Sequence, residues 1–496
     1  MSDAVVTFDS EPPTVADIVA IANGARVEIG PRAERRIVAS RAVVEAAIAD
    51  GRPVYGLNTR LGAGRDDRVS DDDLLEFQRR IIANHRGGVG DALGEREVRA
   101  IIASRLAGFT RGGSGVQVEL ARAYADLLNA HIYPVVPARG SVGAADLTLL
   151  AEIAAVVTGD GRAFVDGVVV TGGEALAAAG LCPIVLQPHE GLAVLSSNAY
   201  SIGVGALTVA SLSTVVSGVD LAVALSLEAI ASAGPAANLS AFSTEIADAR
   251  GGDGQRASSA AIRDALAGSA VTASDRSVTV QDPIAFRTAP QVNGAAREAI
   301  ERASVEIARE LDARSDNPLV DVASGRMISG GNFQAVPLAL AFENLRVALA
   351  HVASASERRI STLSGLLADA RKAGRTRVPG LLAYSAAAAL AEVRHLAAPA
   401  TLGVTTLSGV EDHASLAPLA LQLLERSASL VAEIVAIEAL HAIDLLGANA
   451  VSPTGAGTGP LADRIDALIA SGLAAAELVP AVSATIPLRA GAGGWG

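Results

Sequence analysis

The chain has 496 residues, 50% of them hydrophobic and 3% aromatic, and a formal net charge of −13. This length can bury a large core and suggests two or three domains. The acidic balance argues against nucleic acid or an anionic membrane as a partner, because both bind basic surfaces. Cys182 is the single cysteine, which excludes an intrachain disulfide and a cysteine-cluster metal site. The N-terminus lacks the basic start and apolar stretch of a signal peptide, so we expect a cytoplasmic protein.

The first third of the chain predicts helices separated by loops. Residues 14–50 show helical spacing, and residues 53–70 form a loop containing Gly and Asn. Residues 72–130 return to helices, with breaks at Gly87-Gly88 and Gly112-Gly113. Another helix is expected to end at Gly159. Residues 162–170 then place an Asp-Gly pair between two apolar runs, which predicts a β-hairpin.

From residue 190 onward the pattern predicts mostly long helices. Three segments repeat apolar positions at helical spacing: 295–312, 338–363 and 419–446. Residues 192–218 carry no charge and could span a bilayer, but their serines would be costly in lipid. We expect a helix buried by other helices, and no membrane partner. The predicted fold is all-α, with a long helical bundle over 191–496 and a smaller, loop-rich N-terminal domain over 1–190 that carries the active-site loops.

Several motifs stand in a fixed order along the chain. They are Tyr55-Gly56-Leu57-Asn58-Thr59-Arg60-Leu61-Gly62, Asn84-His85-Arg86-Gly87-Gly88, Gly140-Ser141-Val142-Gly143-Ala144-Ala145-Asp146-Leu147, Gln281-Asp282-Pro283-Ile284-Ala285-Phe286-Arg287, Ser329-Gly330-Gly331-Asn332-Phe333 and Glu411-Asp412-His413. The set resembles the aromatic amino-acid ammonia-lyase and aminomutase family, to which histidine ammonia-lyase belongs; the first motif matches its Tyr-Gly-x-Asn-Thr-Gly-Phe-Gly loop. The resemblance implies a carbon–nitrogen lyase acting on a small amino acid, histidine-like or aromatic. It also implies a homotetramer whose active sites combine residues of several subunits.

The same resemblance assigns roles to individual residues. Tyr55 matches the base that removes the substrate β-proton, Arg287 would hold the substrate carboxylate, and Glu411 would lie near the amine. Glutamate at this last position favours a histidine-like substrate, because the phenylalanine and tyrosine lyases commonly have glutamine there. The positions expected to bind substrate are His85, Asn58, Ser196, Gln281 and Phe333.

The residue types suit this chemistry on their own terms. A phenol titrates near about 10, so Tyr55 needs nearby positive charge or hydrogen bonds to act as a base; a loop tyrosine packing on a helix is the alternative. The guanidinium of Arg287 suits a carboxylate held by two hydrogen bonds, the alternative being a structural pair with Asp282 or Glu310. The 411–413 cluster of two acids and a histidine lacks a second histidine one helical turn away, so we expect no metal.

The Gly140–Leu147 motif lacks the residues that form the family's cofactor. Family members cyclise an Ala-Ser-Gly triad into a methylidene-imidazolone (MIO), an electrophile that attacks the substrate. Here Ala144, Ala145 and Asp146 occupy that position, so the segment is one residue short and contains no serine. Forming the group requires the middle residue to lose water, and alanine has no hydroxyl to lose. We therefore expect no MIO and no other cofactor.

Further departures from the family pattern accompany this loss. Ile284 replaces the second active-site tyrosine, Ser196 stands where an asparagine contacting the electrophile is expected, and Gln334-Ala335 replaces His-Gly. The base, the carboxylate ligand and the amine neighbour are all kept, which indicates a remodelled site. Three functions stay open: an ammonia-lyase-like enzyme, an MIO-independent elimination, cyclisation or isomerisation of another carboxylate-bearing small molecule, or a non-catalytic homologue.

Overall fold

The computed structural model describes residues 4–273, 278–402 and 411–486. The chain forms two compact units. The first contains Met1–Ala210, Ala303–Phe342 and Ala400–Leu421, and the second contains Ser211–Arg302, Glu343–Pro399 and Gln422–Gly496. This division differs from the predicted single boundary at residue 190. The chain returns to the first unit twice, once along helix 289–312 and once through the segment after residue 396, and helical periodicity carries no sign of such a return.

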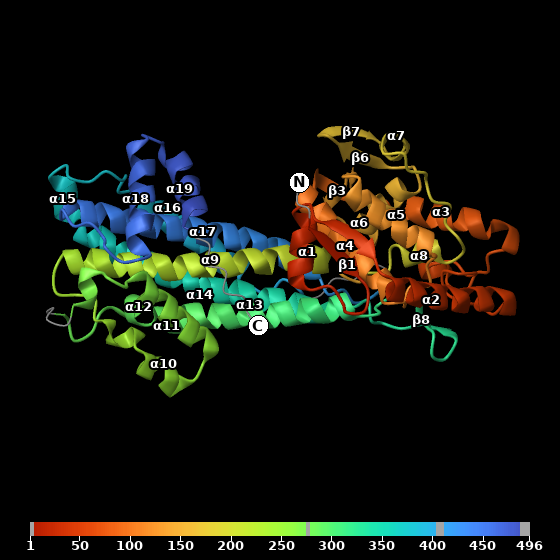
Figure 1. The fold of residues 1–496 in the computed structure, drawn as a ribbon, viewed down its shortest axis with the longest axis horizontal. Helices are drawn as coiled ribbons and strands as arrows, with labels where there is room; N and C mark the ends of the chain where they lie inside the picture. Colours follow the sequence, from red (N-terminus) through yellow and green to blue (C-terminus); the bar gives the residue numbers. More distant parts are fainter. Residues whose placement is uncertain (1–3, 274–277, 403–410, 487–496) are drawn as a thin grey trace. The chain divides into compact units, whose positions relative to one another are not determined.

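The first unit combines helices with short strands (Figure 1). Its helices are α1 Val15–Ala22, α2 Pro31–Asp50, α3 Leu74–His85, α4 Glu95–Thr110, α5 Val118–Asn129, α6 Leu147–Val157, α7 Gly172–Ala178 and α8 Glu190–Ala193. Its strands are β1 Val5–Phe8, β2 Arg26–Ile29, β3 Val89–Ala92, β4 Tyr133–Pro134, β5 Pro137–Arg139, β6 Arg162–Val165, β7 Val168–Thr171, β8 Leu319–Asp321 and β9 Arg326–Ile328. They pair as β1–β2, β3–β5, β4–β6–β7 and β8–β9.

The local sequence explains where many of these elements begin and end. Helix α1 starts at a capping box, in which Thr14 Oγ1 accepts a hydrogen bond from Asp17 N at 3.2 Å and the Asp17 carboxylate accepts one from Thr14 N at 2.8 Å. The predicted hairpin is confirmed: β6 and β7 pair antiparallel. Its turn residues Asp166 and Gly167 both have positive φ, as a two-residue hairpin turn requires.

The prediction of helix throughout residues 14–50 is wrong over residues 26–29. Strand β2 separates α1 from α2 and pairs in parallel with β1, matching Val6 with Val27. Gly24, at φ 102°, reverses the chain between α1 and β2. The strand owes its conformation to a partner about twenty residues earlier, and periodicity within the segment does not reveal such a partner.

The second unit is helical, as predicted, and contains most of the length of the longest helices. Helices in or entering this unit are α9 Ala199–Ser232, α10 Thr244–Arg250, α11 Asp253–Ala265, α12 Ile284–Arg287, α13 Ala289–Asp312, α14 Val336–Leu366, α15 Ala368–Lys372, α16 Leu382–Leu396, α17 Ala417–Ala448, α18 Thr458–Ala470 and α19 Ala475–Thr485. In this unit α9, α14 and α17 run alongside one another (Figure 1), and one buried carboxylate, Glu438 of α17, bonds to both of the others. The predicted all-α fold is confirmed, with only short strands beside the helices.

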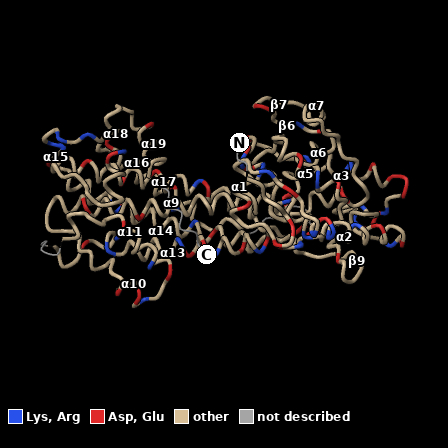
Figure 2. The backbone as a smooth tube through the Cα atoms, viewed as in Figure 1, with Lys and Arg blue, Asp and Glu red and all other residues tan. Residues whose placement is uncertain are grey.

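Two described helices, α9 and α14, are long and apolar enough to cross a membrane by length and composition. A core helix passes the same test, and 61% of the most apolar window of α9 is buried within the protein. This burial agrees with the interpretation of residues 192–218 as a core segment, although the helix itself begins at Ala199. Acidic and basic residues are interspersed along both units (Figure 2).

Candidate functional site

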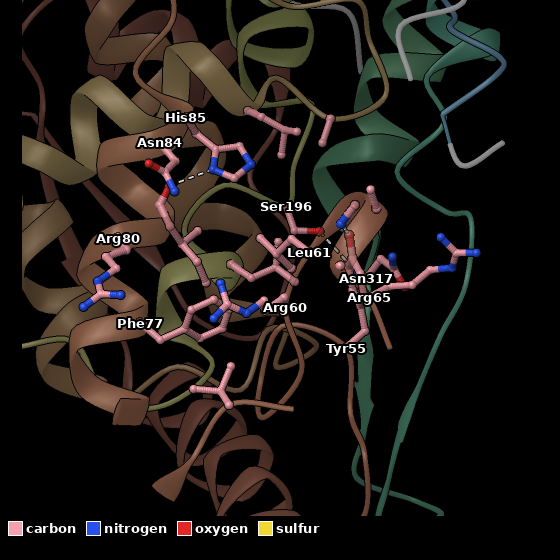
Figure 3. Close-up of a pocket in the computed structure, with 18 of the residues that line it drawn as sticks. Tyr55, Arg60, Leu61, Arg65, Phe77, Arg80, Asn84, His85, Ser196 and Asn317 are labelled. Atoms are coloured by element: carbon pink, nitrogen blue, oxygen red, sulfur yellow. Dashed lines mark hydrogen bonds between the residues drawn. The ribbon is translucent and has the colours of Figure 1, made fainter. Parts of the chain in front are cut away.

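A cavity of about 780 Å³ lies in the first unit, a size suited to a small-molecule ligand. It is bordered by the loop before α3, one face of α3, the alanine-containing segment before α6, the turn after α8 and the chain on either side of β8 and β9 (Figure 3). Seven of the positions singled out from the sequence line it: Tyr55, His85, Ala144, Ala145, Ser196, Phe333 and Glu411. Four do not: Asn58, Asp146, Gln281 and Arg287.

Tyr55 stands on a loop that is held by its own hydrogen bonds. Gly62 N donates to Tyr55 Oη at 3.1 Å, and Tyr55 is bridged to Thr59. Asn58 is buried; its Nδ2 donates to Arg52 O and its Oδ1 accepts from Val54 N, both at 2.8 Å. The expected contact between Asn58 and substrate is therefore not supported by this geometry. Its amide is used within the loop, where it positions the backbone that carries Tyr55.

His85 and Ser196 present polar groups to the cavity (Figure 3). His85 Nδ1 lies 2.7 Å from Ile81 O. A carbonyl only accepts, so in the neutral ring the proton sits on Nδ1 and Nε2 is left as an acceptor. Ser196 Oγ accepts from Asn317 N at 2.9 Å, which leaves its hydroxyl proton available to a ligand.

The segment at the cofactor position forms part of the cavity wall. Ala145 has a left-handed backbone at φ 61°, and its N–H donates to Phe333 O at 3.3 Å. Asn198 Nδ2 donates to the same carbonyl at 2.8 Å, and Ala144 is bridged to Gln334. The residues present do not fit an MIO group, because neither alanine has a hydroxyl and the amide that follows Ala144 is already used in the wall.

Asp146 lies behind that wall, fully buried. Its carboxylate accepts hydrogen bonds from Ser141 Oγ at 2.6 Å and from Ser201 N at 3.1 Å, and its own N–H donates to Ser197 O at 2.7 Å. Burial raises the pKa of Asp146 to about 6, while the bonds from Ser141 and Ser201 act in the opposite direction. The residue ties the alanine segment to the start of α9 and does not touch the cavity.

Arg287 and Gln281 line a different cavity, of about 510 Å³, in the second unit. The alternative of a structural ion pair is not seen: within the described residues Arg287 pairs with neither Asp282 nor Glu310, and its buried Nε has no partner. The carboxylate of Asp282 instead accepts hydrogen bonds from Ala237 N at 3.2 Å, from Asn238 N and from Thr279 Oγ1. Tyr55 and Arg287 thus line different cavities, one in each unit.

Sequence reasoning missed a group of basic residues at the cavity of the first unit. Four arginines line it: Arg60, Arg65, Arg68 and Arg80. The acids that line it are Asp73 and Glu411. One signal was available, because Arg60 stands where the family loop has glycine. Across residues 4–273, 278–402 and 411–486, no group of three or more His, Cys, Asp or Glu side chains could hold a metal ion. His413 instead contacts Gln334, with Nδ1 3.1 Å from Gln334 Nε2.

Comparison with known proteins identifies the family. A family model described as aromatic amino acid lyase matches residues 14–467. Histidine ammonia-lyase of Anaeromyxobacter sp. (strain K) is 38% identical over 462 residues, covering 89% of this chain and 90% of its own. Histidine ammonia-lyase of Paracidovorax citrulli (strain AAC00-1) is 38% identical over 439 residues, covering 86% and 85%.

Solved structures agree with these matches. The ergothioneine degrading enzyme ergothionase from Treponema denticola, in complex with desmethyl-ergothioneine sulfonic acid, superposes with a TM-score of 0.90 at 27% identity, covering 97% of this chain and 98% of its own. Histidine ammonia-lyase from Trypanosoma cruzi superposes with a TM-score of 0.84 at 27% identity, covering 97% and 93%. The likeness extends over nearly the whole chain in sequence and in fold, and the protein therefore belongs to the aromatic amino acid lyase family, as a carbon–nitrogen lyase acting on a small molecule.

Proposed function

We propose that this enzyme eliminates an amine from a histidine-like substrate without an MIO group, using Tyr55 as the base. The observation that carries the proposal is the composition of one cavity, in which Tyr55, His85 and Glu411 face a wall made of Ala144 and Ala145. The relatives that support a histidine-like substrate are histidine ammonia-lyases. The Treponema denticola neighbour is named for degrading ergothioneine, a sulfur-bearing derivative of histidine whose amine is trimethylated.

The missing electrophile restricts the leaving group. The N–H protons of an α-ammonium group are far more acidic than the β-hydrogen, so a base strong enough to remove the β-hydrogen removes an N–H proton first. The resulting neutral amine departs poorly. A quaternary amine has no N–H proton and keeps its charge, so we propose a substrate whose amine is permanently cationic. In the reaction, Tyr55 Oη takes the β-proton, the C–H electron pair forms the double bond, and the amine leaves with the electrons of the C–N bond.

The remaining residues of the cavity supply binding. The carboxylate of Glu411 attracts a cationic amine, and His85 Nε2 accepts a hydrogen bond from a donor on the substrate ring. Arg287 and Gln281, which line the cavity of the second unit, hold the substrate carboxylate from a neighbouring subunit, as the family resemblance implies. This part of the proposal requires a homotetramer whose sites are shared between subunits.

A second candidate is release of ammonia from L-histidine itself, which the 38% identity to histidine ammonia-lyases favours. General-base help is worth about 10²–10⁴-fold, far less than the acceleration that enzymes commonly reach. An unactivated ammonium group would therefore need a second source of activation at the position that Ala144 and Ala145 occupy.

The experiment that tests the proposal compares two substrates that differ only at nitrogen. L-histidine and its Nα-trimethyl derivative are incubated with wild type, Tyr55→Phe and, as a matched control, Tyr384→Phe, an exposed tyrosine that does not line the cavity. We expect release of trimethylamine, a fall of about 10²–10⁴-fold in Tyr55→Phe, and no change in the control. Ammonia release from L-histidine that depends on Tyr55 would establish the second candidate, and no amine from either substrate would contradict both.

The absence of the electrophile has an independent test. The intact mass of the purified protein is expected to equal that of the unmodified chain. A deficit of two water molecules, mapped to the peptide that contains Ala144 and Ala145, would show that a cyclised group forms after all.

A further inference from the structure

We infer that Arg60 binds a second anionic group of the substrate, carried on its side chain and separate from the α-carboxylate. The inference deepens the proposed function, because it takes from it only the location of the substrate in the cavity of the first unit. Arg60 thereby determines substrate specificity, and Tyr55 remains the base of the elimination.

The backbone of Arg60 is held in place by the loop that carries Tyr55. Arg60 N donates to Asp67 O at 2.9 Å, Val69 N donates to Asn58 O at 3.0 Å, and Thr59 is bridged to Arg68. These bonds close residues 58–69 into a compact loop whose two limbs cannot separate freely. The Arg60 side chain lines the cavity, among the other lining side chains that include Leu61 and Phe77 (Figure 3).

Arg60 also differs from the other arginines of the cavity because its guanidinium has neither a hydrogen-bond partner nor an acidic partner among the described residues, whereas each of the other three has one. Arg80 Nε lies 3.3 Å from Glu76, Arg65 Nε lies 3.9 Å from Asp66, and Arg68 Nη1 donates to Gly51 O at 2.8 Å. A guanidinium without a counter-charge offers its paired N–H donors to an anion that enters the cavity.

The charge balance of the cavity points the same way. The chain as a whole carries −13, yet four arginines and two acids, Asp73 and Glu411, line this cavity. Ser70 Oγ donates to Asp73 at 2.6 Å, so that carboxylate already has a hydrogen-bond partner. Arg65 and Arg80 already have acidic partners in Asp66 and Glu76, and Arg68 donates to Gly51 O. In the proposed function Glu411 receives the cationic amine, so Arg60 is the cation of this wall that is left for a further anion.

The α-carboxylate is not the group that Arg60 is needed for. The proposed function assigns that carboxylate to Arg287, and the family loop that the Tyr55 motif resembles has glycine at the position of Arg60. A guanidinium added to this loop therefore supplies an additional contact. The chemistry that fits it is a sulfonate, carboxylate or similar anion on the ring or side chain of the substrate.

The test measures binding, without turnover, for two ligands that differ by one anionic group. They are 3-(imidazol-4-yl)propanoate and the same molecule with a sulfonate on the ring, titrated by calorimetry into the full-length protein. We expect wild type to bind the sulfonated ligand about tenfold more tightly. In Arg60→Gln that preference should fall below about twofold, with the affinity for the unsulfonated ligand unchanged, and Arg60→Lys should keep part of it.

Arg79→Gln is the matched control, because Arg79 is an exposed arginine of α3 that does not line the cavity. It should retain the full preference. The inference is overturned if wild type shows no preference, if the preference survives in Arg60→Gln, or if Arg60→Gln weakens both ligands equally, which would assign the α-carboxylate to Arg60. Neither ligand has an amine to lose, so failure of the elimination reaction and failure of this inference are read separately.

Discussion

Asp146 is the residue that fastens the alanine segment to the rest of the first unit. Its carboxylate accepts from Ser141 on one side and Ser201 on the other, while its backbone N–H reaches Ser197 O. These contacts set the position of Ala144 and Ala145 in the cavity wall. The same contacts require that the carboxyl group is buried away from water, which disfavours its charged form and raises the pKa of Asp146 to about 6.

That raised pKa makes a prediction about stability. The folded protein binds the Asp146 proton up to a pH of about 6, and the unfolded chain releases it near about 4. Between these values the folded state holds more protons, so the free energy of unfolding falls as pH rises, by at most about 3 kcal/mol. Asp146→Asn removes this titration. Urea unfolding measures the free energy of unfolding of wild type and Asp146→Asn at about pH 4.5 and pH 7. Wild type should be more stable relative to Asp146→Asn at pH 4.5 than at pH 7. The same difference in free energy at both pH values would refute the assignment.

At the scale of elements, α9 approaches α4 closely enough that only a glycine fits. A Cβ at Gly203 would lie 2.5 Å from Ala100 O, a backbone atom that cannot move aside without shifting α4. Gly203→Ala is therefore expected to destabilise the protein by about 1–3 kcal/mol. Gly365, in α14, has nothing within 4 Å of its added Cβ, so Gly365→Ala should be neutral or stabilising by up to about 1 kcal/mol. Chemical unfolding of both variants checks the contrast, and equal effects would exclude a steric cause.

A buried ionic network joins three helices of the second unit. Glu438 of α17 accepts from Arg359 Nε of α14 at 2.6 Å and from Ser226 Oγ of α9 at 2.8 Å, and both charged side chains are fully buried. Glu438→Gln leaves the guanidinium without its counter-charge, which should cost about 3–5 kcal/mol. Replacing both partners together, as Glu438→Leu with Arg359→Met, should cost less than the single change. Urea unfolding of the two variants measures the difference, and a single change no costlier than the double would mean that the pair is not isolated from water.

At the scale of the whole molecule, Tyr55 and Arg287 line separate cavities, one in each unit of the chain. Large apolar side chains are exposed in the described single chain, among them Val280 at 90% and Leu402 at 81%. The proposed sharing of active sites between subunits of a homotetramer predicts that light scattering gives about four times the chain mass of 49.9 kDa.

Shared sites predict complementation between two inactive variants. Tyr55→Phe and Arg287→Gln, each nearly inactive alone, should recover about a quarter of the wild-type specific activity when coexpressed, because random mixing leaves that fraction of sites with both residues intact. Native mass spectrometry verifies that hybrid oligomers form. Hybrids without any recovered activity would mean that Tyr55 and Arg287 do not serve the same site.

The sequence by itself determined the helices, the hairpin at residues 162–170 and the family, because periodicity, turn chemistry and ordered motifs are local properties of the chain. It also identified the alanines at the cofactor position. Only the tertiary structure decided that residues 26–29 form a strand, that Asn58 turns into its own loop, that Arg60 lines the cavity and that Arg287 does not. These outcomes depend on partners far away in the chain and on the direction in which a side chain points, and spacing along the sequence specifies neither.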